Sequence, residues 1–446
     1  MYKYPILKIV LALCYCMAAA GARGQELTGD SLSLSDCIRL ALKNSYIAQS
    51  ANLGTRLARI DHQESRQSLI PGVSMGVGHN LSQGRSIDLV TNQYINQNFS
   101  SGNQYISGSV TLFRGLEALN RIRQQAAAGK AAAFEEQAVK DQLMLDVILA
   151  YMQVLTARDM WAQTEKRIEL TKQQVKRATD LHSSGVIPPS DFYDLKGQLA
   201  GDLNALNEIR KAHMEARINL ARLMNIPYEQ AGPVASISLE VPRSAAAALA
   251  PSEVQENAAL WLPSLKAAEW RIAQAQDGIR VARAGHSPRL TMGGGFQSTY
   301  SSNSSLGYFE QAKNNLGRYL SFGLTIPLTD HILIRNNVAR ARINLEDAGY
   351  RARNTELEWQ STITQTLFNL ELAKENYHNL TEREENLQES FRIATARFQA
   401  GDINSVLFLT AKNNLEQAMA DKIIGRYQWT LQQYFADYFN GKLSLQ

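Results

Sequence analysis

The stretch that decides the fold is ITQTLFNLELAKENYHNLTEREENLQESFRIATARF, residues Ile363 to Phe398. Mainly apolar residues recur in it every seven positions, Glu384 being the one polar interruption, and a second row follows three positions after the first. The first row is Ile363, Leu370, Tyr377, Phe391 and Phe398, and the second is Thr366, Ala373, Leu380, Leu387 and Ala394. Two such rows form a coiled-coil seam, so the stretch is predicted to be a long helix paired with another helix.

The same pattern occurs 216 residues earlier in the chain. Gly185 and Gly401, where the two helices are expected to end, are separated by the same offset. Five apolar positions and a terminating glycine at one offset indicate an internal duplication rather than two unrelated core helices. The earlier rows are Val147, Val154, Trp161, Ile168 and Val175, with Ala150, Ala157, Thr164, Thr171 and Ala178.

Residues 1–24 have the features of a secretory signal peptide, since two lysines precede an apolar run and small residues follow it. Cys14 and Cys16 lie in this segment, and neither follows the small residue that lipoprotein processing prefers, which leaves their lipidation open. Cys37 is the single cysteine of the mature chain. It is expected to serve as a small apolar residue of the first helix, without a disulfide partner or a metal.

Charge and motifs exclude several classes of function. The chain has 46 Lys and Arg against 42 Asp and Glu, but three of the basic residues lie in the signal peptide, so the mature chain is nearly neutral. No basic patch indicates nucleic acid binding. The seven histidines are scattered, with no pair at metal-ligand spacing, and there is no Gly-x-Ser-x-Gly motif. We therefore expect no catalytic residues, no cofactor and no metal.

Residues 25–226 are predicted to form the first repeat. Its two strands alternate in polarity, as a membrane-spanning strand does when one face meets lipid and the other a wet lumen. The long helix has roughly 65 residues, which corresponds to about 100 Å. The expected elements are a helix capped by Ser35 or Asp36 that ends near Ser68, a β-hairpin at 73–113 with a polar loop at 82–103, a helix from about Leu116 to Gly185, and a return helix capped by Ser190 or Asp191 that ends near Met224.

Residues 227–251, rich in proline and small residues, are predicted to be a connector with one short extended piece at 237–241. Residues 252–446 then repeat the order of the first half. The expected elements are a helix at about 252–284, a β-hairpin at 289–327 with a loop at 301–317, a long helix at about 332–399 and a final helix at about 405–439.

Four spanning strands cannot close on themselves, and an open edge in lipid leaves backbone groups unpaired at a cost of several kcal/mol each. The chain is therefore expected to oligomerise. A dimer would give eight strands and a trimer twelve. An eight-stranded barrel is filled by side chains, so the long helices favour the trimer, because a conduit that they continue needs an open lumen.

Three segments, in this order and with strands between long helices, resemble the TolC-like outer-membrane efflux protein family. They are Leu34–Asn44 (LSDCIRLALKN), Leu262–Glu269 (LPSLKAAE) and Arg397–Gly401 (RFQAG). The similarity covers nearly all of the mature chain. It implies a mainly helical homotrimer with a twelve-stranded barrel in the outer membrane of a Gram-negative cell and a large periplasmic helical tunnel. It also implies docking to a periplasmic adaptor coupled to an inner-membrane pump or an export ATPase.

The two helical tips are the candidate functional sites that this resemblance implies. The expected adaptor-docking residues are Gly185, Val186, Ile187, Pro188, Pro189, Gly401, Asp402, Ile403 and Asn404. The expected residues of the tunnel constriction are Asp191, Asp194, Phe398 and Ser405. The alternative interpretation is that the tips are plain connections, with Asp191 capping a helix and Asp194 solvated. Ser405 and Phe408 stand where the family pattern favours Asp, so a less charged gate is expected.

A periplasmic coiled-coil adaptor is the alternative function, because it shares the secretory signal and a helical hairpin. An adaptor would have a single helical hairpin and a β-rich remainder without paired lipid-facing strands. The doubled hairpins and strands favour the exit duct of an efflux or secretion system. The sequence does not identify the transported substrate.

Overall fold

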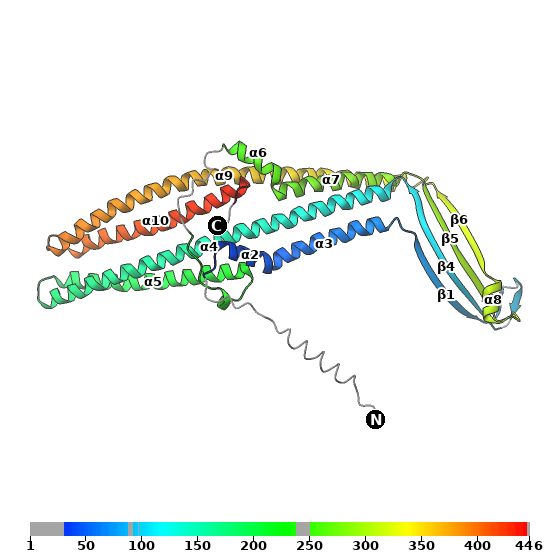
Figure 1. Cartoon of the computed structure of the whole chain (residues 1–446), viewed down its shortest axis with the longest axis horizontal. Coiled ribbons are helices and arrows are strands. Elements are labelled where there is room, and N and C mark those ends of the chain that lie inside the picture. Colours follow the sequence, from blue (N-terminus) through cyan, green and yellow to red (C-terminus); the bar gives the residue numbers. More distant parts are fainter. Residues whose placement is uncertain (1–30, 88–91, 97, 238–249, 444–446) are drawn as a thin grey trace, which may run out of the picture.

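The computed structural model describes residues 31–87, 92–96, 98–237 and 250–443. The expected signal peptide, with Cys14 and Cys16, lies outside the described residues, as does all but the first residue of the extended piece expected in the connector. The described part is elongated. A β-sheet lies at one end, the tips of two helical hairpins lie at the other, and short elements gather between them (Figure 1).

Two helices run through most of the helical body. They are α4 (Glu117–Ser183, 67 residues) and α9 (His331–Gln399, 69 residues), and each is on the order of 100 Å long, as predicted. α5 (Pro189–Met224) returns along α4, and α10 (Ser405–Phe439) returns along α9. Figure 1 shows these pairs as two hairpins whose tips lie side by side.

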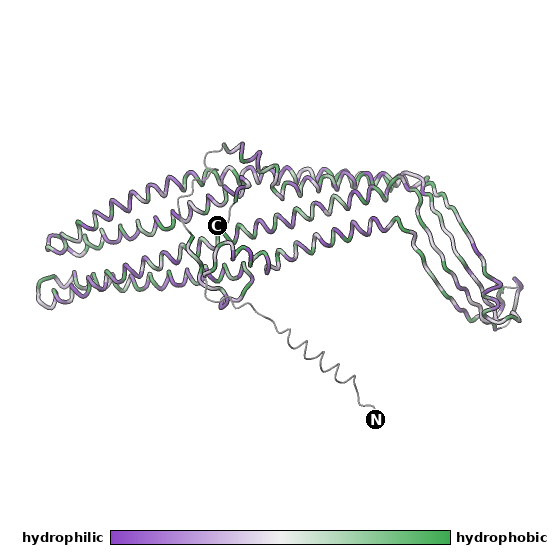
Figure 2. The backbone as a smooth tube through the Cα atoms, viewed as in Figure 1, coloured by the Kyte–Doolittle hydropathy of each residue, from purple (hydrophilic) through white to green (hydrophobic). Residues whose placement is uncertain are grey.

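Between the hairpins and the sheet, two shorter helices complete the layer. α3 (Tyr46–Gln67) packs on α4, and α7 (Pro263–Ala284) packs between α4 and α9. Hydrophilic and hydrophobic residues alternate along all of these helices (Figure 2). In the part of the chain that the structure describes, none of the helices combines the length and the apolar character that a membrane crossing requires.

The two predicted coiled-coil seams differ in burial. Val147 and Val154 of the first seam are fully buried, because α4 contacts α3, α5, α7 and α10. In the second seam Ile363 and Leu370 are buried, but the later positions are only partly covered. α9 lies at the margin of the layer, and among the described elements its main packing partners are α6, α7 and α10.

The first helix of each repeat is broken into two, which the sequence analysis did not predict. α2 (Leu34–Asn44) precedes α3, and α6 (Pro251–Trp261) precedes α7. The physical causes are local. Ser45 caps α3 through the Ala48 amide, and Pro263 cannot donate the backbone hydrogen bond that would continue α6. The N-cap of α2 is Ser33, two positions before Ser35, and Asp36 takes part as its partner in a reciprocal capping box.

The sheet contains the four predicted strands as one antiparallel layer in the order β1-β4-β5-β6. Pairing of β4 with β5 joins the two halves of the chain, while in the described part of the chain β1 and β6 each have a neighbour on one side only. Residues directly opposite each other point to the same face. One face of the sheet carries the apolar cross-strand sets Met75–Ile106–Phe296 and Val110–Met292–Phe322. The strands are Gly72–Ser82, Phe99–Arg114, Arg289–Ser301 and Gly317–Thr325.

The two loops at the far end of the sheet are more structured than predicted. β4 begins at Phe99, so the first loop is shorter than 82–103, and its described residues contain a small hairpin of β2 (Arg85–Ile87) and β3 (Tyr94–Asn96). The second loop contains the short helix α8 (Tyr308–Asn314).

The main hydrophobic core lies midway along the molecule, around the middle of α4. α2, the described part of the connector, α6 and the end of α10 meet there. The Tyr151 hydroxyl donates toward the carbonyl oxygens of Leu32 (3.0 Å) and Ala235 (2.7 Å), next to a parallel bridge between Leu32 and Val234. Cys37 is a fully buried member of this core, as predicted. This cluster ties the start of the first repeat to the connector.

Candidate functional site at the helical tips

Both helical hairpins turn at a glycine in the left-handed backbone conformation. φ is +72° at Gly185 and +76° at Gly401. In each turn the glycine amide bonds the carbonyl three residues back, and the next amide bonds the carbonyl five residues back, which is the Schellman arrangement. A Cβ at either glycine would meet no atom within 4 Å. The requirement for glycine is therefore one of backbone conformation and not of space.

The predicted docking residues divide into exposed and half-buried ones. Ile187 and Ile403 pack on a small apolar cluster whose buried members are Ala178, Leu195 and Phe408. Asn404 caps α10 by accepting from the Leu407 amide at 3.1 Å. The exposed residues, which are available to a partner at the outer end of the tips, are Gly185, Val186, Pro188, Pro189, Gly401, Asp402 and Asn404.

A groove of about 540 Å³ runs between the two tips. It is lined from the first hairpin by residues that include Val186, Ile187 and Pro188, and from the second by residues that include Asp402 and Ile403. Most of the predicted docking residues therefore surround one concave feature, although they come from segments more than 200 residues apart in the sequence.

Three of the four predicted constriction residues meet at one point. The Ser405 hydroxyl lies 2.8 Å from Asp191 Oδ1 and 2.7 Å from Asp194 Oδ2, and the Ser405 amide lies 3.4 Å from Asp191 Oδ1. Ser405 and Asp191 are buried and Asp194 is exposed. The hydroxyl has one proton for two carboxylates. Asp191 therefore contacts the other hairpin, and the capping position that was expected for it or Ser190 is occupied by Pro188, which makes no side-chain cap.

The fourth predicted constriction residue, Phe398, lies in the neighbouring apolar cluster. Its ring stacks on Phe408 with centroids 4.6 Å apart and planes 17° from parallel. Phe398 thus packs the second hairpin internally and makes no polar contact with Asp191 or Asp194.

From Ser405 the contact between the two hairpins continues along α10, away from the tips, as a row of mainly polar residues that we call the polar row. Residues at seven-residue spacing along α10 face the first repeat, where an apolar seam would be ordinary. Ser405 meets Asp191, Lys412 meets Asp202, Met419 accepts from Gln163, and Arg426 bonds Asp159. The row that makes these contacts consists of Ser405, Lys412, Met419 and Arg426.

Lys412 is the centre of a buried ionic network that the sequence analysis missed. Its Nζ lies 3.0 Å from Asp202 Oδ2 and 3.0 Å from Glu416 Oε1, while the Lys412 and Asp202 side chains are 3% and 2% exposed. Arg167 on α4 lies 3.6 Å from Asp202 and 3.5 Å from Glu416. Asp202 also accepts from Thr171 and Gln198, both at 2.7 Å. Two cations and two carboxylates thus join α4, α5 and α10.

The two carboxyl groups of this network respond differently to burial. Desolvation opposes ionisation of Asp202, but the hydrogen bond from Thr171 and the charge of Lys412 outweigh it, so the pKa of Asp202 is lowered. Desolvation raises the pKa of Glu416 despite the nearby Lys412 and Arg167. Asp202 is therefore the firmly ionised partner of Lys412.

The seven-residue spacing of the last helix could have indicated this network. Lys412 follows Ser405 by seven residues and lies in the seam of the last helix. A lysine at a seam position of a coiled coil usually faces a partner of opposite charge or fixes the register. The partner of Lys412 could not be predicted from the sequence, because Asp202 lies 210 residues away in the chain.

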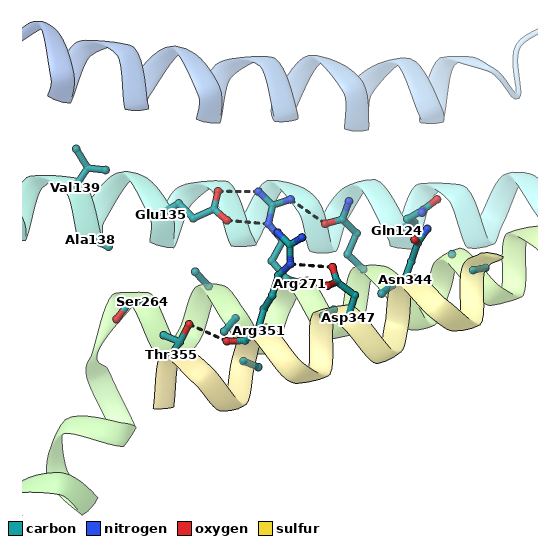
Figure 3. A pocket seen from close by; sticks show the side chains of 18 residues that line it. Gln124, Glu135, Ala138, Val139, Ser264, Arg271, Asn344, Asp347, Arg351 and Thr355 are labelled. Carbon is teal, nitrogen blue, oxygen red and sulfur yellow. Dashed lines mark hydrogen bonds and ion pairs between the residues drawn. The ribbon is translucent and has the colours of Figure 1, made fainter. Parts of the chain in front are cut away.

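A second groove of about 720 Å³ lies in the sheet-side half of the helical body, between α4, α7 and α9. Figure 3 shows Arg271 of α7 reaching Glu135 of α4 through paired contacts of 2.8 and 2.7 Å. Close to this pair, Arg351 and Asp347 of α9 form an ion pair with each other. Much of the lining is alanine, whose small side chains leave the space between the helices. None of the predicted tip residues lines it.

The structure brings together two histidines that the sequence analysis treated as scattered. Nδ1 of His286 lies 3.1 Å from Nδ1 of His331, although the residues are 45 positions apart. Among the described residues there is no group of three or more His, Cys, Asp or Glu placed to hold a metal ion.

A protein-family model described as outer membrane efflux protein matches residues 37–225 and 254–434. The chain belongs to the outer membrane efflux protein family. Both matched segments contain one long helical hairpin and two strands of the four-stranded sheet. This is a family of channels, not of enzymes, and its members reside in the outer membrane with a large periplasmic tunnel.

Individual relatives agree with the family match. The chain is 22% identical over 400 residues to the outer membrane protein TolC of Salmonella enteritidis, covering 86% of this chain and 76% of the relative. It is 23% identical over 392 residues to the pyoverdine export outer membrane protein OpmQ of Pseudomonas aeruginosa, covering 85% and 79%. The outer membrane protein VceC of Vibrio cholerae has the same fold, with a TM-score of 0.80, 13% identity and coverage of 92% and 97%.

The predicted function is confirmed at this level: the chain is an outer-membrane exit duct of an efflux system. The comparisons give no support to the alternative of a periplasmic adaptor.

Proposed function

We propose that three copies of the chain close a twelve-stranded barrel in the outer membrane and continue it as a helical tunnel through the periplasm. The observation that carries this proposal is the sheet order β1-β4-β5-β6, whose two outer strands each lack a neighbour on one side among the described residues. In lipid, unpaired backbone groups on such edges cost several kcal/mol each, and closure with further copies removes them. Twelve strands give an open lumen, whereas eight are filled by side chains.

The helical layer supports the same assembly. α9, at one margin of the layer, exposes Ile343, Tyr350 and Leu357 at seven-residue spacing, in a row separate from the buried row that contains Ile363 and Leu370. α3, at the other margin, exposes Ile47, Leu53, Leu57 and Ile60. Apolar residues at helical spacing are suited to packing against a neighbouring helix, so the α9 margin of one copy fits the α3 margin of the next.

Native mass measurement of the detergent-extracted protein tests the assembly, and three chains are expected. Leu357→Glu puts a charge into the proposed helix contact and should shift the population toward smaller species. A stable dimer or monomer recovered from the outer membrane would contradict the proposal.

We further propose that the tips dock a periplasmic adaptor, which couples the duct to an inner-membrane pump or export ATPase. In support, the groove between the tips gathers most of the predicted docking residues, and several of those residues are exposed. The Asp191–Ser405–Asp194 contact and the polar row above it are proposed to hold the two hairpins together at the narrow end of the tunnel. Polar contacts suit this place, because water can replace them when the hairpins part.

Substitution of the turn glycines tests the docking role. Gly401→Val and Gly185→Val put a β-branched residue into the left-handed conformation, which costs about 1–2 kcal/mol in each turn. Gly349→Val is the matched control, since Gly349 lies inside α9 without a positive φ, and a Cβ added there would meet no atom within 4 Å. The expected result is a membrane-inserted trimer that has lost adaptor crosslinking and export in the tip variants only. Wild-type crosslinking in both tip variants would show that the turns are plain connections.

The internal division of the chain also remains a proposal. We propose that 1–24 is removed as a signal peptide, and that 25–226 and 252–446 are repeats of one unit joined by the connector 227–251. Each repeat then supplies one strand hairpin to the barrel and one helical hairpin to the tunnel.

A further inference from the structure

His286 and His331 form an exposed pair at the point where the sheet joins the helices. Their Nδ1 atoms are 3.1 Å apart, and the rings lie 18° from parallel with centroids 5.4 Å apart. His286 lies between the end of α7 and the start of β5 at Arg289, and His331 is the first residue of α9, after β6 ends at Thr325. Arg289 and Thr325 are cross-strand partners. The pair therefore spans the base of the β5–β6 hairpin.

We propose that this pair is a binding site for a divalent transition-metal ion of the Zn²⁺, Cu²⁺ or Ni²⁺ class. Neutral imidazole nitrogen is a preferred ligand of these ions. With metal–nitrogen bonds of about 2.05 Å, two nitrogens 3.1 Å apart subtend an angle of about 98° at the metal. This value lies between the 90° of adjacent ligands in a square or octahedral site and the tetrahedral 109°. The two nitrogens are already at chelating distance.

In the metal-free protein, a hydrogen bond already holds the two Nδ1 atoms close together. One ring donates its Nδ1 proton to the Nδ1 lone pair of the other, so the two nitrogens are held facing each other. When both rings carry their proton on Nε2 instead, both Nδ1 lone pairs become available to one ion. The change is a tautomer shift through solvent in one ring together with a rotation of both exposed rings, which turns the lone pairs from each other toward the ion, and no proton is lost from the pair. Both rings are exposed, so an ion and its water have direct access.

The remaining coordination positions belong to water. Among the described residues no third His, Cys, Asp or Glu is placed to complete the site. A two-imidazole site with open water positions exchanges its ion readily, unlike a closed structural zinc site. Its structural effect follows from its place: the bound ion links the end of α7 to the start of α9 across 45 residues and holds the base of the second strand hairpin closed.

Copper titration of the mature protein in detergent, with any affinity tag removed, tests the site. Electron paramagnetic resonance should show one Cu²⁺ per chain with two nitrogen ligands. His286→Gln and His331→Gln should each remove one nitrogen and weaken binding by at least about tenfold. His378→Gln is the matched control, because His378 is also exposed on α9 but lies about 70 Å along the helix from His331.

A second measurement uses Zn²⁺ and does not depend on copper. Zn²⁺ should protect His286 and His331 from acylation by diethyl pyrocarbonate while His378 stays reactive. Equal copper affinity and nitrogen count in wild type, His286→Gln and His331→Gln would overturn the proposal. So would the absence of binding by the wild-type protein at micromolar copper, which would show that the pair is a hydrogen bond only.

Discussion

Lys412→Met is the substitution that most directly tests how the two helical hairpins are held together. Methionine keeps the length and the apolar part of the side chain but removes the ammonium group, which lies 3.0 Å from both Asp202 and Glu416. At an effective dielectric constant of about 20, each of these contacts has a Coulomb energy of about 5.5 kcal/mol. Most of that energy is offset by the cost of removing the charges from water.

The net loss of stability caused by Lys412→Met depends on the contacts that Asp202 keeps. Removing one partner of a buried ion pair usually costs about 3–5 kcal/mol, because the other charge stays buried. Asp202 keeps its hydrogen bonds from Thr171 and Gln198 and the more distant Arg167, so the lower end, about 3 kcal/mol, is expected. Lys422→Met is the matched control on the same helix. Lys422 pairs with Glu384 of α9, but its side chain is 28% exposed, so a loss below about 1 kcal/mol is expected.

Hydrogen exchange of the assembled protein measures this difference locally. A loss of about 3 kcal/mol corresponds to more than a hundredfold faster exchange in the tip-side segments of α5 and α10, provided that exchange follows local opening. Lys412→Met should show this acceleration and Lys422→Met should not. The double variant Lys412→Met/Asp202→Asn should be less perturbed than the sum of the single variants by at least about 1 kcal/mol. Equal exchange rates in the two lysine variants would refute the reasoning.

Three further predictions use single side chains. Ser405→Ala removes the hydroxyl that bridges two carboxylates, so the tunnel end should open more readily and single-channel conductance in planar bilayers should rise; unchanged conductance would exclude Ser405 from the constriction. The hydrogen bond from Lys140 lowers the pKa of Glu136 from 4.5 to about 2, so its carboxylate stabilises the folded state above about pH 4.5 and this contribution is lost as the pH falls toward 2. The melting temperature of Glu136→Gln should therefore lie below that of wild type at pH 7, and by less at pH 3; an equal gap at both pH values would contradict this. Burial raises the pKa of Cys37 to about 12, so maleimide should label it at neutral pH only after denaturation, and rapid labelling of the native protein would be inconsistent with the core described above.

The periodic parts of this protein could be predicted because their signals are local. Seven-residue apolar spacing specified both long helices, and alternation specified all four strands, without any information about their partners. Gly185 and Gly401 could be placed at the tips because a left-handed turn favours glycine whatever surrounds it. The breaks at Ser45 and Pro263 were missed, although both have local causes, because the apolar period continues across them.

The pairing of distant polar residues was decided only by the tertiary structure. Asp191 and Ser405 were each selected from the sequence, but their contact joins positions 214 residues apart, and the Lys412–Asp202 pair joins positions 210 apart. A seam position shows that a residue faces a neighbouring helix, whereas the axial register between two helices depends on the packing of every side chain along them. The contact of His286 with His331 likewise required the β5–β6 pairing to bring the ends of two helices together. Sequence periodicity therefore determined the elements and their exposed turns, and tertiary packing determined which charged and polar groups meet.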